Sequence, residues 1–158
     1  MTVGPTIAVL NGPNLNLLGT REPARYGTDT LADVEELCRR TATEVGYGLD
    51  FRQTNHEGEL VELVQDVRET ASGVVLNAGA YSHTSIAVRD ALATVAAPVI
   101  ELHLTNVHAR EGFRHHSYVA GLAAAVIAGC GPAGYAFAIR HLAALDASTT
   151  GEVQRAGR

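Results

Sequence analysis

The sequence predicts an α/β fold, a doubly wound five-stranded parallel sheet with helices on both faces. Short apolar segments rich in branched residues alternate with helical patterns, at a spacing of roughly 25 residues. Connections of this length allow the right-handed crossovers that parallel strands require. With 158 residues, 46% of them hydrophobic, the chain is long enough for one ordinary domain with its own core.

Five strands are expected where short apolar runs are bounded by Gly, Pro or Asn, as buried parallel strands tend to be. The fifth run (GLAAAVIA) could continue a helix or form a strand, and we assign it to a strand because glycines and Pro132 interrupt it. The expected strands cover residues 7–10, 49–52, 74–76, 99–102 and 121–128.

Helices are expected between these strands, over residues 31–45, 57–71 and 85–96, where apolar side chains recur at helical spacing. Thr30 can cap the first of them. Pro132 suits the first turn of a final helix that reaches about Leu145. Residues 1–145 are therefore expected to form a single domain, and the polar residues 146–158 a disordered C-terminal tail.

Charge and composition exclude several classes of function. The net charge of -5 gives no reason to expect nucleic acid or an anionic membrane as a partner. No apolar run reaches the length of about 18 residues that a membrane span needs, and the N-terminus lacks the pattern of a signal peptide. We expect a cytoplasmic protein in which Cys38 and Cys130 are buried, reduced thiols.

All twelve basic residues are arginine, and the chain contains no lysine. Schiff-base chemistry on a side-chain amine is therefore impossible, and so is a Walker phosphate loop with its lysine.

Polar side chains collect where three of the expected strands end, over residues 11–26, 77–83 and 103–114. Ligands of doubly wound sheets bind at this edge. Asn55 and His56 follow the second strand, but a polar turn explains them equally well, and we assign them no role.

Other motifs at the same edge are weaker. Residues 129–134 match the dinucleotide pattern GxGxxG, but too little chain follows for a further strand, and tight helix packing is the better interpretation. Four histidines lack cysteine or acidic partners at the spacing of metal ligands, so neither a metal nor a cofactor is expected; they are His103, His108, His115 and His116.

Three long segments carry a family resemblance: NGPNLNLLGTREPARYG, NAGAYSHTSIAVRDAL and ELHLTNVHAREGFRHHSY. In order and spacing they resemble the signature regions of type II 3-dehydroquinate dehydratases, and the match extends from about Ile7 to Leu145. The resemblance implies a flavodoxin-like fold and a dodecamer built of trimers. It also implies conversion of 3-dehydroquinate to 3-dehydroshikimate and water through an enolate, without cofactor, in the shikimate pathway or in quinate catabolism. A nucleotide- or flavin-binding module of the same fold is the alternative.

The resemblance makes Tyr26 the general base. A free phenol has a pKa of about 10, so a tyrosine base needs a neighbouring cation that stabilises its anion. Arg21 matches the arginine of the family motif and is expected to supply that cation, with Arg25 as a rival. Gly19 and Gly27 bracket this segment, which we interpret as a mobile lid.

His103 matches the general acid of the family, and Glu101, on the same side of the strand, can orient its imidazole. Asn14 matches the residue that holds a water against the enolate oxygen.

The substrate-binding residues follow from the resemblance as well. The backbone N–H groups of Leu104 and Thr105, the Thr105 hydroxyl and Asn77 are expected to bind the carboxylate. Asp90 is expected to reach the site of a neighbouring subunit, and Arg110 to form a loop or intersubunit ion pair. His83 and Arg114 are expected to bind the ring hydroxyls of the substrate.

Overall fold

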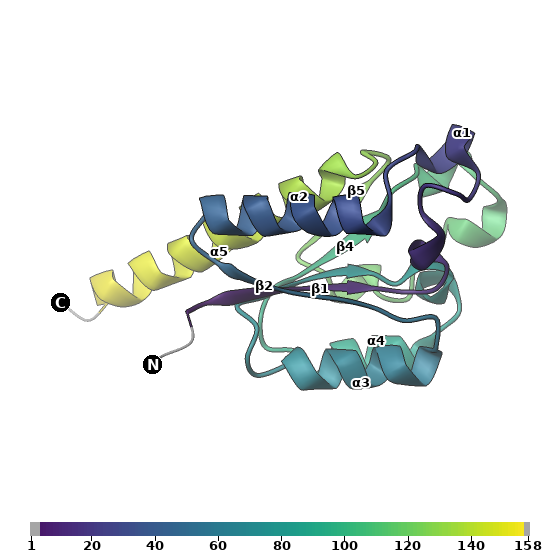
Figure 1. The fold of residues 1–158 in the computed structure, drawn as a ribbon. Helices are drawn as coiled ribbons and strands as arrows, with labels where there is room; N and C mark the ends of the chain where they lie inside the picture. Colours follow the sequence, from purple (N-terminus) through teal and green to yellow (C-terminus); the bar gives the residue numbers. More distant parts are fainter. Residues whose placement is uncertain (1–3, 157–158) are drawn as a thin grey trace.

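The computed structural model describes residues 4–156, with side chains described as far as residue 149. Its centre is a parallel five-stranded sheet with the strand order β2-β1-β3-β4-β5, which confirms the predicted class (Figure 1). The strands are β1 (Thr6–Asn11), β2 (Gly48–Gln53), β3 (Gly73–Asn77), β4 (Val99–His103) and β5 (Ala125–Ala128).

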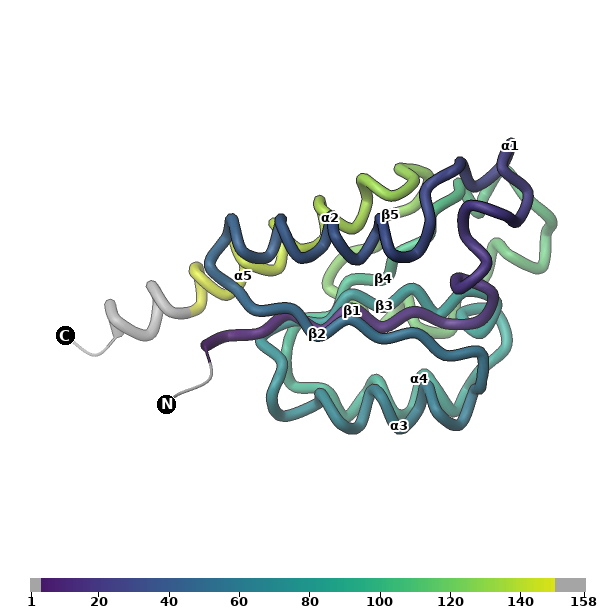
Figure 2. The backbone as a smooth tube through the Cα atoms, in the orientation of Figure 1, coloured from purple at the N-terminus to yellow at the C-terminus, as the bar shows by residue number. Residues whose placement is uncertain are grey.

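Helices cover both faces of the sheet, as Figures 1 and 2 show. One face carries α2 (Leu31–Glu44) and α5 (Ala133–Ala156), and the other carries α3 (Glu57–Val67) and α4 (Ile86–Leu92). A separate apolar core lies on each face. Every residue of β3 and β4 is buried, as expected of strands covered on both sides.

Local sequence accounts for the start of α2. The Thr30 hydroxyl accepts a hydrogen bond from the Asp33 N–H (3.2 Å), and the Asp33 carboxylate accepts one from the Thr30 N–H (2.8 Å). This reciprocal capping satisfies two N–H groups that the first turn leaves without intrahelical partners.

Several boundaries differ from the prediction. The fifth strand begins at Ala125 because residues 120–122 form a 3-10 turn, and α3 and α4 each end earlier than expected. A short helix, α1 (Pro23–Tyr26), was not predicted.

The end of α5 is the largest correction. The helix continues through Ala156 instead of ending near Leu145, so it takes in most of the tail that was expected to be disordered. One contact stabilises the helix beyond its expected end at Leu145: the Tyr47 hydroxyl donates a hydrogen bond to Asp146 Oδ2 (2.6 Å). A contact between residues so distant in sequence could not be inferred from local polarity.

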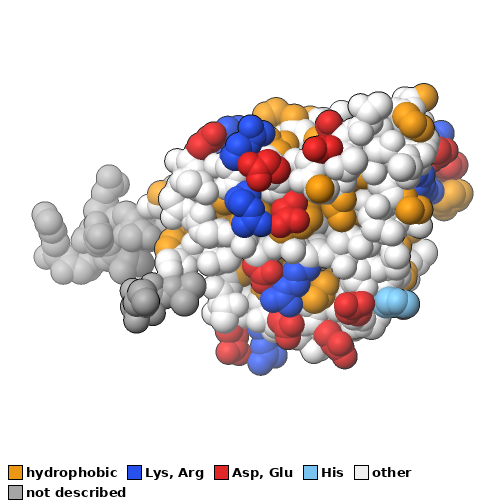
Figure 3. Space-filling view, in the orientation of Figure 1, with side chains coloured by type: hydrophobic (Ala, Val, Ile, Leu, Met, Phe, Trp, Pro, Cys, Tyr) orange, Lys and Arg blue, Asp and Glu red, His pale blue; other side chains and the backbone are white. Residues whose placement is uncertain are grey.

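The molecular surface carries interleaved acidic and basic side chains on the face drawn in Figure 3. Within residues 4–156, none of the helices combines the length and the apolar character needed to cross a bilayer.

Candidate active site

A polar cavity of about 170 Å³ lies at the carboxyl ends of the strands. Its walls come from the loops after β1, β3 and β4, the three segments in which the sequence gathers polar residues. Most of the predicted site residues line it, namely Asn14, Arg21, Tyr26, Asn77, His83, His103, Leu104 and Arg114.

The loop after β1 is held close to the sheet. A Cβ atom at Gly12 would lie 2.4 Å from the Ala78 carbonyl oxygen, so only glycine fits there. Asn14 adopts the left-handed conformation (φ 67°), which asparagine tolerates better than most residues. Its N–H donates to Asn55 Oδ1 (2.9 Å), so Asn55, to which the sequence assigned no role, helps to position Asn14.

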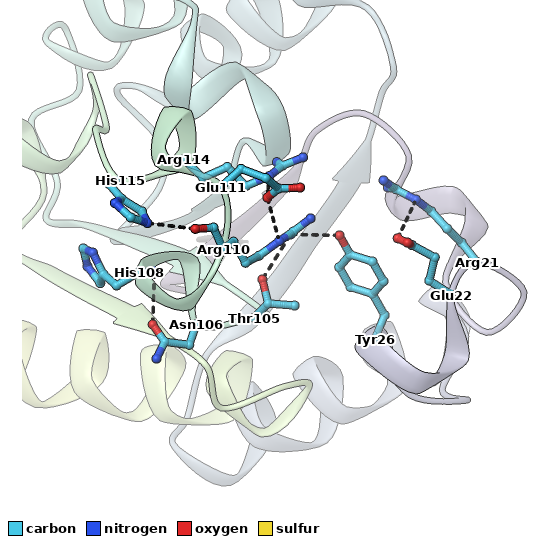
Figure 4. Close-up of polar contacts among 10 residues, drawn as sticks. All are labelled: Arg21, Glu22, Tyr26, Thr105, Asn106, His108, Arg110, Glu111, Arg114 and His115. Atoms are coloured by element: carbon cyan, nitrogen blue, oxygen red, sulfur yellow. Dashed lines mark hydrogen bonds and ion pairs between the residues drawn. The ribbon is translucent and has the colours of Figure 1, made fainter.

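Tyr26 ends α1, and its hydroxyl is held by an arginine from another part of the chain. Arg110 Nη1 donates to this hydroxyl at 3.0 Å (Figure 4). Arg21, the arginine predicted for this place, lies against the face of the ring, with its guanidinium carbon 5.2 Å from the ring centroid. Its Nε is 4.0 Å from Glu22. Tyr26 thus lies between two cations, and Arg110, which was expected only in an ion pair, is the one that reaches its oxygen.

Arg110 is fixed from several sides, as Figure 4 shows. The Arg110 side chain is 11% exposed, and its Nη1 also lies 3.3 Å from Thr105 Oγ1. Glu111 lies 3.5 Å from Arg110 Nε and 2.9 Å from Arg114 Nε, so one carboxylate joins both arginines. His115 Nε2 donates to the Arg110 carbonyl oxygen (3.0 Å), because a carbonyl can only accept.

The side of the cavity that carries His103 is formed by β4. Glu101 and His103 are both buried, and His103 Nε2 lies 2.6 Å from Glu101 Oε1, which agrees with the predicted pairing. The Ser117 hydroxyl donates to the same carboxylate oxygen at 2.6 Å. The other carboxylate oxygen, Oε2, is buried and has no hydrogen-bond partner among the described residues.

His83 stacks on His103, with 5.8 Å between ring centroids and 16° between ring planes. Its Nδ1 donates to the His116 carbonyl oxygen (2.7 Å), which leaves Nε2 of the neutral ring as an acceptor. Partial burial is the main reason why the pKa of His83 lies below its usual value. The neutral form is therefore favoured at neutral pH.

Asn77 is oriented by a chain of buried hydrogen bonds that the sequence did not reveal. Its Nδ2 donates to the Tyr135 hydroxyl (2.9 Å), and that hydroxyl donates to Asn11 Oδ1 (2.6 Å). Asn11 Nδ2 donates to the Arg52 carbonyl, and the Gly79 N–H donates to Asn77 Oδ1. A backbone carbonyl accepts at one end of this series of hydrogen bonds, and a backbone N–H donates at the other end. These two groups fix which atom donates and which accepts in every hydrogen bond of the series.

Three predicted residues do not line the cavity in this single chain, and one of them is the buried Glu101 described above. Thr105 lines an adjacent groove, on the far side of the contact between Tyr26 and Arg110. Asp90 is exposed on α4 and lies 3.3 Å from Arg89 of the same helix. Leu104 lines both the cavity and the groove.

The remaining motifs are accounted for by packing. A Cβ atom at Gly134 would lie 2.9 Å from Leu102 Cδ1, so this glycine of the GxGxxG match permits close approach of α5 to the sheet. Throughout the part of the chain that the structure describes, no three His, Cys, Asp or Glu side chains come together as metal ligands would.

Fold and site together define a class: a doubly wound α/β protein with a phenol beside two guanidinium groups and a carboxylate-bound imidazole in one cavity, an arrangement suited to acid–base chemistry. The family model described as dehydroquinase class II matches residues 5–143. The chain belongs to this class II dehydroquinase family.

Individual relatives agree with the family match. The chain is 58% identical over 142 residues to a 3-dehydroquinate dehydratase of Methylobacterium radiotolerans, covering 90% of this chain and 95% of the relative. It is 59% identical over 140 residues to one of Streptomyces avermitilis, covering 88% of each. The crystal structure of type II dehydroquinase from Propionibacterium acnes matches with a TM-score of 0.85 and 42% identity, over 88% of this chain and 96% of that one. The fold is flavodoxin-like, as the resemblance implied.

Proposed function

We propose that this chain converts 3-dehydroquinate to 3-dehydroshikimate and water through an enolate, with Tyr26 as base and His103 as acid. Family membership supports the reaction, and the presence of both side chains in one cavity supports the mechanism. The phenolate takes the proton beside the ketone, the enolate collapses, and the carbon–oxygen bond of the tertiary hydroxyl breaks. The hydroxyl leaves as water with the proton from His103.

The hydrogen bond from Arg110 to Tyr26 is the observation that carries the proposal. A guanidinium always donates and never accepts, so this bond strengthens when the phenol loses its proton. Arg21 adds positive charge at the ring face. Two guanidinium groups therefore face the side chain that would carry the negative charge of the proposed base.

The acid is supported from the opposite side. Buried Glu101 holds His103 Nε2, which leaves Nδ1 as the nitrogen available to the cavity. A charged imidazole beside a carboxylate is stabilised, so His103 can carry the proton that the leaving hydroxyl needs.

The polar lining fits a small polyhydroxylated carboxylate. Asn14, a neutral donor, is proposed to hold a water against the enolate oxygen. Asn77 and the backbone N–H groups at Leu104 and Thr105 are proposed to bind the carboxylate, and His83 and Arg114 the ring hydroxyls. Rotation of Thr105 away from Arg110 would free its hydroxyl for this purpose.

Asp90 is proposed to act in the site of a neighbouring subunit, within a dodecamer built of trimers. Its exposure on α4, away from the cavity of its own chain, supports this assignment. Mixing inactive Asp90→Ala subunits with inactive Tyr26→Phe subunits should regenerate active sites. Failure of such mixtures to recover activity would remove Asp90 from the mechanism.

The segment from Gly19 to Gly27 is proposed to close over the substrate. Both glycines have positive φ values (88° and 81°), and α1 between them has no buried residue. Crystals with and without bound substrate analogue would test this lid, because equal order of Arg21 and Tyr26 in both would contradict it.

Activity itself is tested by adding 3-dehydroquinate to purified, chelator-treated protein and following the ultraviolet absorbance of the conjugated enone. We expect the signal to survive chelation. No signal, or a signal that chelation abolishes, would contradict the proposal and favour a binding module of the same fold.

A further inference from the structure

Ser117 lies within the third signature segment, but neither the resemblance nor the proposed mechanism gives it a role. It lies in the segment HHSY, after the arginines of the cavity wall and before a 3-10 turn. Its hydroxyl makes three hydrogen bonds. The backbone N–H groups of Val119 and Ala120 donate to it at 3.2 Å each, and it donates to Glu101 Oε1 at 2.6 Å.

The direction of these bonds is fixed by the chemistry of the partners. A serine hydroxyl has one proton and two lone pairs, and two backbone N–H groups occupy the lone pairs. Its single proton therefore has to point at Glu101. Unlike an ordinary serine hydroxyl, this one cannot rotate to become an acceptor without breaking two bonds to the backbone.

The fixed direction of the Ser117 hydroxyl affects the proton that lies between Glu101 and His103. Glu101 Oε1 receives the Ser117 proton while His103 Nε2 lies 2.6 Å away. An unprotonated carboxylate oxygen accepts two donors well, whereas an oxygen that already carries a proton is a poor acceptor. The other oxygen, Oε2, offers no compensating hydrogen bond within residues 4–156, so Ser117 supplies half of the donors that this carboxylate has.

We propose that Ser117 is a positioning residue that keeps the shared proton on His103 Nε2 and not on Glu101. In this role it preserves the carboxylate that supports a charged imidazole, and it fixes Nδ1 as the nitrogen that faces the reaction. The kinetic part of this inference rests on the proposed role of His103 as acid, whereas the location of the proton does not.

The test combines spectroscopy and kinetics on Ser117→Ala. We expect the ¹⁵N signal of His103 Nε2 to shift toward the value of an unprotonated ring nitrogen. The alanine variant loses the hydrogen bond from Ser117 to the charged Glu101 carboxylate, and such a bond contributes more free energy than one between neutral groups. We therefore expect kcat to fall about 10- to 100-fold, with KM changed less than about threefold. Ser117→Thr keeps the hydroxyl and should restore both readouts. Ser117→Cys, with a much weaker donor, should show the same changes in smaller measure and serves if the alanine variant does not fold.

Thr54→Val is the matched control. The Thr54 hydroxyl also donates to a glutamate, Glu59, and accepts a backbone N–H, that of His56 (3.0 Å), but it does not line the cavity. The control should lower thermal stability to a similar degree while leaving kcat and the His103 signal unchanged. The His83 Nδ1 signal should be constant in every variant, because its partner is the His116 carbonyl.

Two results would overturn the inference. One is an unchanged Nε2 signal in Ser117→Ala, and the other is a loss of kcat that Thr54→Val reproduces in proportion to its loss of stability. A variant His103→Ala with normal kcat would instead contradict the proposed acid, and the spectroscopic result would still stand by itself.

Discussion

The two sides of the cavity are built in opposite ways. His103 follows Glu101 by two residues on a strand in which every residue is buried, and its partner comes from that same strand. Tyr26 ends a four-residue helix without a buried residue, and its hydroxyl is held by an arginine 84 positions away. The proposed acid is therefore placed by the core, whereas the proposed base is placed by the contact between two loops. A buried acid and a base carried on the proposed lid would suit an enzyme whose substrate must enter before water is excluded.

Replacement of the base should have the largest effect on turnover. Tyr26→Phe keeps the ring but removes the proton acceptor, and we expect kcat to fall about 10³-fold or more. KM and the midpoint of thermal unfolding should change little, because the side chain is only partly buried. If KM rises as much as kcat falls, the tyrosine is structural and the comparison fails on this side.

Replacement of the acid should cost both turnover and stability. His103→Ala should lower kcat about 10²-fold. It should also lower the free energy of unfolding by about 3 kcal/mol, because it removes a partner from the buried Glu101 carboxylate. Urea unfolding monitored by circular dichroism measures this term. A variant as stable as Tyr26→Phe would show that the acid side is no more tightly built than the base side.

Arg110→Lys tests whether the base depends on its distant partner. Lysine cannot reproduce the planar guanidinium, which spans Tyr26 and Thr105, so we expect kcat to fall about 10-fold or more. In a Tyr26→Phe background the same change should have almost no further effect on kcat. Additive losses in this double-mutant cycle would separate Arg110 from the base.

Arg114→Ala should mainly weaken binding. Glu111 holds the Arg114 guanidinium at 2.9 Å on the cavity wall, and within the described residues no hydrogen bond joins this guanidinium to Tyr26, Glu101 or His103. We expect KM to rise about 10-fold while kcat stays within about threefold. A fall in kcat at unchanged KM would move Arg114 from substrate binding into the chemistry.

The two cysteines allow the core and the loops to be compared by their reactivity toward a thiol reagent, which is the smallest effect that we predict. Cys38 lies on α2 and is buried in the core between this helix and the sheet, and burial raises the pKa of its thiol to about 12. Cys130, which was expected to be buried, is exposed between two glycines of the groove beside Tyr26, because it lies in the loop after β5 and not within the apolar run that precedes it. A thiol reagent at pH 8 should label Cys130 rapidly and Cys38 only on unfolding. Equal labelling in the folded protein would show that the core opens as readily as the loops.

The features that local sequence determines could be predicted, whereas those that depend on contacts between distant segments could not. The sheet, the helices and the pairing of Glu101 with His103 could be predicted, because periodicity and strand alternation are local properties. The Arg110 contact to Tyr26 could not, because nothing in the spacing indicates which of several loop arginines meets the phenol. The buried hydroxyl of Tyr135 and the helix beyond Leu145 were missed for the same reason: each depends on contacts between distant segments. Ser117 belongs to a quoted signature segment, but its contact with Glu101 could not be predicted from that segment.

The most direct test of the division between base and acid is exchange of the proton beside the ketone of 3-dehydroquinate in D₂O, followed by ¹H NMR. Formation of the enolate requires only the base side. His103→Ala should therefore introduce deuterium into recovered substrate while dehydrating it slowly, and Tyr26→Phe should exchange no faster than substrate without protein. Exchange in Tyr26→Phe, or its loss in His103→Ala, would contradict the assignment of base and acid to the two sides of the cavity.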